Sequence, residues 1–69
     1  MKLYKVVTRQ GDKSFELLFA NETKASAAFD VEVNTLQNIE FWFSVTLEVY
    51  EESFEGFFVK THTLRHYEP

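Results

Sequence analysis

The sequence predicts an α+β fold: a four-stranded antiparallel sheet in the order strand–strand–helix–strand–strand (ββαββ), with one helix packed on one face. Three observations lead to this prediction. They are twelve alternating residues from Ile39 to Tyr50, an earlier pair of β-rich segments joined by a turn signal, and apolar residues at helical spacing between them. A chain of 69 residues has the size of one domain, so residues 1–69 are expected to form a single domain.

The segment from Ile39 to Tyr50, IEFWFSVTLEVY, alternates between an apolar set and a more polar set of side chains. Alternation over this length indicates a long strand with one buried and one solvent-exposed face. Glu40, Trp42, Glu48 and Tyr50 belong to the exposed set. Trp42 is then either available to a partner or covered by the helix or the terminal residues, and the sequence leaves both alternatives open.

The first predicted hairpin joins strands over residues 2–9 and 14–20. Gly11 and Asp12 are expected to form its two-residue loop, because glycine adopts the positive φ angle of tight hairpin turns and Asp tolerates the next position. The resulting register keeps apolar side chains on one face. Its facing pairs are Thr8 and Phe15, Val6 and Leu17, and Tyr4 and Phe19.

A helix is predicted from Glu22 to about Leu36, with Asn21 as its N-cap. Its apolar residues recur at steps of 3, 1, 4 and 3, at Ala25, Ala28, Phe29, Val33 and Leu36. Residues 29–33 (FDVEV) also alternate as a strand would, but the alanines and the cap favour a helix. Asn38 is expected to take the left-handed conformation that ends a helix.

The last predicted strand covers residues 54–67, after a three-residue loop at residues 51–53. This loop sets Leu47 opposite Phe57 and Val45 opposite Val59, and Gly56 is a position where a bulge would shift the register. The predicted core comprises ten residues: Val6, Leu17, Phe19, Phe29, Val33, Phe41, Phe43, Val45, Leu47 and Val59.

Composition excludes several classes of function. The chain has no Cys, so it forms no disulfide or thiolate site, and it has no serine elbow, Gly-rich phosphate loop or HExxH motif. His62 and His66 are expected to lie about 13 Å apart along a strand, too far to share a metal. We therefore expect no enzyme activity, no cofactor and no metal. Without a signal peptide or an apolar run of about 18 residues, a cytoplasmic location is expected.

The charge of the chain is uneven, because residues 25–59 contain seven carboxylates and no Lys or Arg. This pattern favours a basic surface of a protein partner over nucleic acid, although acidic groups also simply keep a Phe-rich domain in solution. The predicted partner-binding residues are Glu40, Trp42, Glu48, Tyr50, Glu51, Glu52 and Glu55. A nucleic-acid-binding module is the alternative, and it would use Trp42, Tyr50, Lys60, Arg65 and His66. Free sheet edges also predict a homodimer.

The opening residues Met1, Leu3, Lys5, Val6 and Val7 (M-x-L-x-K-V-V) resemble the start of the small antitoxin of T-even phages, Dmd. The likeness covers some seven residues and the order of the first elements, and no functional residue is carried over from it. More broadly, the chain resembles the small acidic inhibitors that phages make against host or anti-phage defence proteins. This resemblance implies a non-enzymatic inhibitor or adaptor that acts by occupying a surface of its target.

Overall fold

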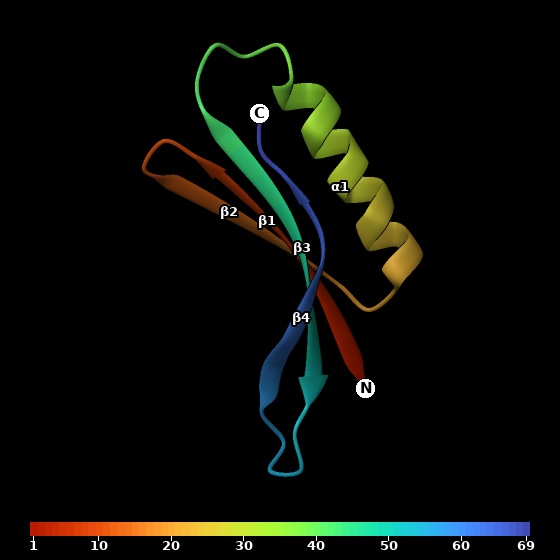
Figure 1. Ribbon diagram of the computed structural model, residues 1–69. Helices are drawn as coiled ribbons and strands as arrows, with labels where there is room; N and C mark the ends of the chain where they lie inside the picture. Colours follow the sequence, from red (N-terminus) through yellow and green to blue (C-terminus); the bar gives the residue numbers. More distant parts are fainter.

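The computed structural model describes residues 1–69 and contains one four-stranded antiparallel sheet with a helix lying along one face (Figure 1). The elements are β1 (Lys2–Gln10), β2 (Lys13–Phe19), α1 (Glu22–Leu36), β3 (Phe43–Glu52) and β4 (Phe58–Tyr67). The strand order across the sheet is β2-β1-β3-β4, so β1 and β3 are central and β2 and β4 are the edges. The predicted α+β class and element order are confirmed.

The first hairpin has the predicted turn and the predicted register. Gly11 has a φ of +61°, and no residue other than glycine has a positive φ. A glycine at the first loop position followed by a residue of negative φ is the arrangement of a type II′ turn, whose twist matches that of the flanking strands. All three predicted facing pairs occur, including Val6 opposite Leu17.

The helix also follows its prediction, from Glu22 to Leu36. The Asn21 side chain accepts a hydrogen bond from the Lys24 backbone N–H at 3.0 Å, which satisfies one of the N–H groups left free at a helix start. The expected left-handed Asn38 is wrong. Instead, Gln37 keeps a right-handed helical conformation and donates its backbone N–H to the Val33 carbonyl at 2.9 Å.

The third strand is shorter than the alternation predicted, because it begins at Phe43 and not at Ile39. Its neighbour β1 ends at Gln10, which faces Phe43, so residues 39–42 have no strand beside them to continue the ladder. Phe41 was expected in the core, but its side chain is 72% exposed in this loop. The alternating pattern in the sequence therefore extends over residues 39–42, beyond the part of β3 that has a hydrogen-bonded neighbouring strand.

The last hairpin turns later than predicted. β3 extends to Glu52, and the loop comprises residues 54–56 in place of residues 51–53. Val45 consequently faces Tyr67 and Leu47 faces Arg65, and two register shifts interrupt the pairing of β3 with β4. Val59 lies near this turn and is 54% exposed, so its assignment to the core was also wrong.

The core lies between α1 and the two central strands. It contains eight buried residues: Val6, Ala25, Phe29, Val33, Leu36, Phe43, Val45 and Leu47. Of the other predicted core residues, Phe19 is partly buried against this cluster, whereas Leu17 is 45% exposed. Leu17 lies on the edge strand β2, which the helix covers less well than it covers β1 and β3.

The Arg65 side chain ties β4 to the helix from the opposite edge. Its Nη2 lies 2.8 Å from Asp30 Oδ1, and its Nη1 donates to Ser26 Oγ at 2.8 Å. The guanidinium also lies over the Phe29 ring, 4.2 Å from the ring centre. Arg65 thus lies over the β4 side of the core with its guanidinium on the Phe29 ring, while its charge is paired with Asp30 at the surface.

Candidate functional site

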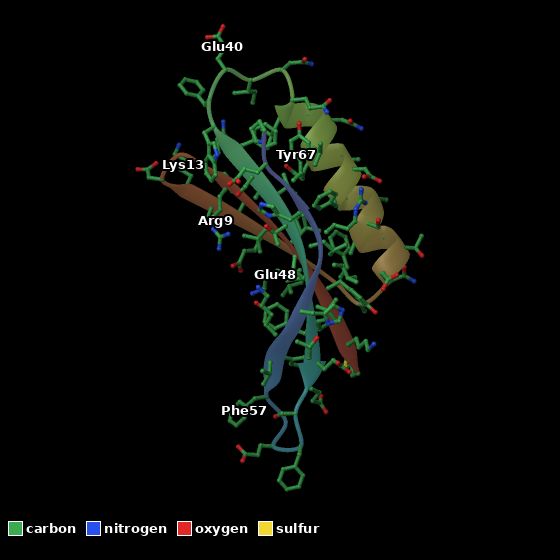
Figure 2. All side chains as sticks on the ribbon, in the orientation of Figure 1. Arg9, Lys13, Glu40, Glu48, Phe57 and Tyr67 are labelled. Atoms are coloured by element: carbon green, nitrogen blue, oxygen red, sulfur yellow. The ribbon has the colours of Figure 1, made fainter.

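The seven residues predicted to bind a partner occupy three separate places on a molecule 43 Å long. Glu40 and the half-exposed Trp42 lie in the loop before β3. Glu48 and Tyr50 lie within β3, and the exposed Glu51, Glu52 and Glu55 lie at its far end and in the turn beyond. Figure 2 shows Glu40 at one end of the molecule, Glu48 between, and Phe57 towards the other end.

Glu48 lies on the open face of the sheet, the face that α1 does not cover, but the expectation that it is exposed is wrong, because it is buried and paired within the chain. Its side chain is 11% exposed, and its Oε2 lies 3.0 Å from Lys60 Nζ. The Tyr50 hydroxyl donates to Oε1 of the same carboxylate at 3.2 Å. These contacts join β3 to β4 and neutralise a carboxylate that would be costly to leave alone at this depth.

Lys5 extends this polar network to β1. Its Nζ lies 4.6 Å from the centre of the Tyr50 ring and 3.6 Å from Glu16 Oε2. Burial lowers the pKa of Lys5, but the interaction with Tyr50, followed by the charges of Glu16 and Glu48, raises it by more. The pKa of Lys5 therefore lies above its ordinary value of 10.5, and its ammonium group is a fixed positive charge at neutral pH.

Three hydrogen bonds close the β3–β4 hairpin tip, defined here as residues 51–59. Ser53 donates its backbone N–H to the Phe57 carbonyl at 2.6 Å, and Gly56 donates to the Ser53 carbonyl at 2.9 Å. The Phe57 N–H donates to Ser53 Oγ at 3.2 Å. Gly56 has a φ of +89°, which a residue with a Cβ rarely adopts, so this glycine permits a tight three-residue loop.

The hairpin tip combines exposed aromatic rings with carboxylates. Phe54 is fully exposed at 102% and Phe57 is 67% exposed, followed by the partly exposed Phe58 and Val59. Glu51, Glu52 and Glu55 are the charged residues of the tip, which contains no Lys or Arg. Figure 1 shows the hairpin extending away from α1, so the helix covers neither of its faces there. An apolar patch with an acidic rim has the character of a protein-binding surface.

Sequence reasoning found the carboxylates of this tip and missed its phenylalanines. The strand predicted over residues 54–67 includes both Phe54 and Phe57, with Phe57 in its alternating set opposite Leu47. The available signal was the run from Ser53 to Gly56, since Ser is frequent at the first position of a turn and Gly at its end. Reading that run as the turn leaves Phe54 at a loop position, where an apolar ring has nothing to pack against.

The basic residues of the nucleic-acid alternative are engaged elsewhere. Lys60 is paired with Glu48, and Arg65 with Asp30. His66 Nδ1 lies 3.0 Å from Thr46 Oγ1 on the open face, whereas His62 faces Val49 on the helix side. No group of three or more His, Cys, Asp or Glu side chains gathers where it would hold a metal ion.

One shallow depression of about 250 Å³ lies at the opposite end from the hairpin tip. The first turn and the neighbouring loop form it, with the lining residues Gln10, Gly11, Asp12, Lys13 and Phe41. It is open, and Phe41 is its one hydrophobic lining residue, unlike the enclosed apolar clefts in which small molecules bind. No helix of the protein has the length and apolar character needed to cross a bilayer.

No family model, curated protein or solved structure matches the chain.

Proposed function

We propose that the protein is a non-enzymatic inhibitor or adaptor that binds a protein partner through its β3–β4 hairpin tip. The observation that carries this proposal is the complete exposure of Phe54 beside Phe57 on a closed, hydrogen-bonded turn. Burying such rings at an interface removes a large apolar area from water, and aromatic residues are frequent among binding hot spots. The closed turn reduces the conformational entropy lost on binding, because the loop is already ordered.

The carboxylates of the tip define the chemistry of the proposed partner. Glu51, Glu52 and Glu55 carry negative charge with no Lys or Arg within residues 51–59. They would steer the tip towards a basic surface and favour an apolar pocket with Lys or Arg at its rim. In keeping with the resemblance to small phage inhibitors, we propose a host or anti-phage defence protein in the cytoplasm as the target.

This proposal keeps part of the acidic-aromatic surface expected from the sequence and adds Phe54 and Phe57 to it. Glu51, Glu52 and Glu55 support the proposal because they belong to the hairpin tip. Glu40 and Trp42 lie at the other end of the molecule and form a separate exposed surface with Phe41. That surface supplies a matched control, because it also displays two aromatic rings in a loop.

The test is affinity capture from a host lysate with three immobilised forms of the protein. They are the wild type, a tip variant (Phe54→Ser with Phe57→Ser) and a loop variant (Phe41→Ser with Trp42→Ser). We expect a partner that the wild type and the loop variant retain and the tip variant loses by tenfold or more in affinity. Thermal melting of all three forms checks that the variants are folded.

Two outcomes would contradict the proposal. Equal capture by the wild type and the tip variant would show that the tip does not carry binding, and loss confined to the loop variant would move the site to residues 40–42. Tight, salt-sensitive binding of RNA or DNA in an anisotropy assay would favour the nucleic-acid alternative instead. We expect no such binding, because Lys60 and Arg65 are already paired with carboxylates.

A further inference from the structure

The two edge strands of the sheet differ in how well they are protected against pairing with another strand. The pairing of β4 with β3 is interrupted by two register shifts, and β4 carries Lys60 and Arg65. Bulges and charged side chains are the usual means of protecting a sheet edge. β2 also carries two charged residues, Lys13 and Glu16, but it pairs with β1 without interruption and contains no proline, so the bulges alone distinguish the two edges. Its outer edge is therefore the one open to strand addition.

The register of the first hairpin determines which backbone groups of β2 point outwards. In a hairpin with a two-residue loop, the residues flanking the loop form a hydrogen-bonded pair, and hydrogen-bonded and non-hydrogen-bonded pairs then alternate. Gln10 and Lys13 flank the loop here, so Leu17 bonds inward to β1. Glu16 and Leu18 direct their N–H and C=O groups away from β1, where no strand of this chain receives them.

The side chains of β2 also leave apolar surface uncovered. Phe15 is 57% exposed and Leu17 is 45% exposed on the helix side of the sheet. Leu18 is 61% exposed on the open face. A second strand beside β2 would cover side chains on both faces at once, as well as the free backbone groups.

The sequence of β2 favours an antiparallel pairing with a second copy of itself that places apolar side chains opposite each other. Centring the pair on Glu16 sets two carboxylates directly opposite each other, which is unfavourable. Centring it on Phe15 gives a single apolar pair within β2, Phe15 against Phe15, and sets Lys13 against the apolar Leu17 of the other copy. Centring it on Leu17 sets Glu16 opposite Leu18, but it gives three apolar pairs, Leu17 against Leu17 and Phe15 against Phe19 twice. It also allows Glu16 and Leu18 to exchange backbone hydrogen bonds across the interface.

We propose that two copies of the chain associate through β2, antiparallel and centred on Leu17, to form a continuous eight-stranded sheet. A second copy fits better than an unrelated strand, because the same five residues supply matched apolar pairs and matched backbone donors and acceptors. The apolar area is small compared with the roughly 1,600 Å² of a standard interface. The dimer is therefore expected to dissociate on dilution.

The absence of cysteine from the chain permits a direct test of this register. The Cα atoms of a non-hydrogen-bonded antiparallel pair lie about 4.5 Å apart, within the range that a disulfide spans. In a Leu17→Cys variant, added oxidised glutathione would convert the two facing thiols to a disulfide and would itself be reduced. A Phe15→Cys variant is the control, because its two thiols lie four residues out of register, about 13 Å apart along the strand.

We expect the Leu17→Cys variant to become a covalent dimer at least tenfold faster than the Phe15→Cys variant. Light scattering of the wild type should give twice the 8.2 kDa chain mass at high concentration. Leu18→Pro should abolish this dimer, since it removes an outward N–H and leaves the bonds to β1 intact. Leu64→Lys, on the other edge strand, should leave it unchanged.

Several results would overturn the proposal. They are a wild type that stays at 8.2 kDa at hundreds of micromolar, equal cross-linking of the two cysteine variants, or loss of the dimer in Leu64→Lys but not in Leu18→Pro. Circular dichroism of Leu18→Pro separates loss of the interface from loss of the fold. A monomer whose β2 binds only an unrelated protein would equally exclude self-association.

Discussion

Phe43 and Phe54 lie near opposite ends of β3 and in opposite surroundings. Phe43 begins the strand, is 2% exposed, and stacks on Tyr67 with the ring centres 5.6 Å apart. Phe54 follows the end of the strand and is fully exposed on the hairpin tip. One end of the strand is covered by α1, and the other extends beyond it (Figure 1).

This difference separates the residues that stabilise the fold from those available for binding. A ring that is already buried contributes to folding but offers no surface to a partner. A fully exposed ring contributes nothing to stability by burial, and its whole surface remains free. The helix-covered end therefore carries most of the stability, and the exposed hairpin tip carries little of it.

The largest expected loss of stability is at the end of β3 that α1 covers. Phe43→Ala should lower the free energy of unfolding by about 3–5 kcal/mol, because it leaves a cavity next to Tyr67 and removes a fully buried ring. Urea or thermal denaturation measures this loss. A variant that melts like the wild type would refute the assignment of Phe43 to the core.

An intermediate loss of stability is expected for the ion pair between Glu48 and Lys60, which lies between the two ends of the molecule. Lys60→Met removes the cation 3.0 Å from the buried Glu48 carboxylate and should cost about 1–2 kcal/mol. Lys5 also faces Glu48 from β1, which limits the loss. The double variant Glu48→Gln with Lys60→Met removes the unpaired charge and should regain part of the stability. No recovery in the double variant would show that Lys60 acts through packing alone.

The smallest effect is expected at the exposed end. Phe54→Ala should change the free energy of unfolding by less than about 0.5 kcal/mol, since the ring is fully exposed and lies outside the core cluster. Denaturation under the conditions used for Phe43→Ala gives a direct comparison of the two phenylalanines. A loss above 1 kcal/mol would mean that the ring packs against the hairpin and is not free for a partner.

The fold could be predicted wherever a local signal fixed the geometry. Gly11 fixed a two-residue turn and hence the register of the first hairpin, and Asn21 with the apolar stripe fixed the helix. The second hairpin carried two competing signals, because the polar residues 51–53 and the run from Ser53 to Gly56 both resemble a turn. Two register shifts then displaced β4 from simple alternation, because each bulge changes which of its residues face each side of the sheet.

The sequence predicted the charged residues of the candidate site but not its exposed aromatic residues. The distribution of carboxylates indicated Glu51, Glu52 and Glu55, because net charge depends on composition and not on register. Trp42 was placed on a strand face only because alternation was extended into residues 39–42, which have no neighbouring strand. The exposure of Phe54 depends on where the chain turns, and the sequence left that position open.

The pairing of β1 with β3 also has a consequence for the order in which the chain folds. Each hairpin can close locally, but this central pairing joins residues 33 positions apart at Gln10 and Phe43 and 49 apart at Lys2 and Glu51. Closing such long loops is entropically costly and slows folding. The docking of the second hairpin onto the first is thus expected to limit the folding rate. Stopped-flow refolding of Val6→Ala tests this, since Val6 faces Leu47 across that junction and its truncation should slow folding more than it accelerates unfolding.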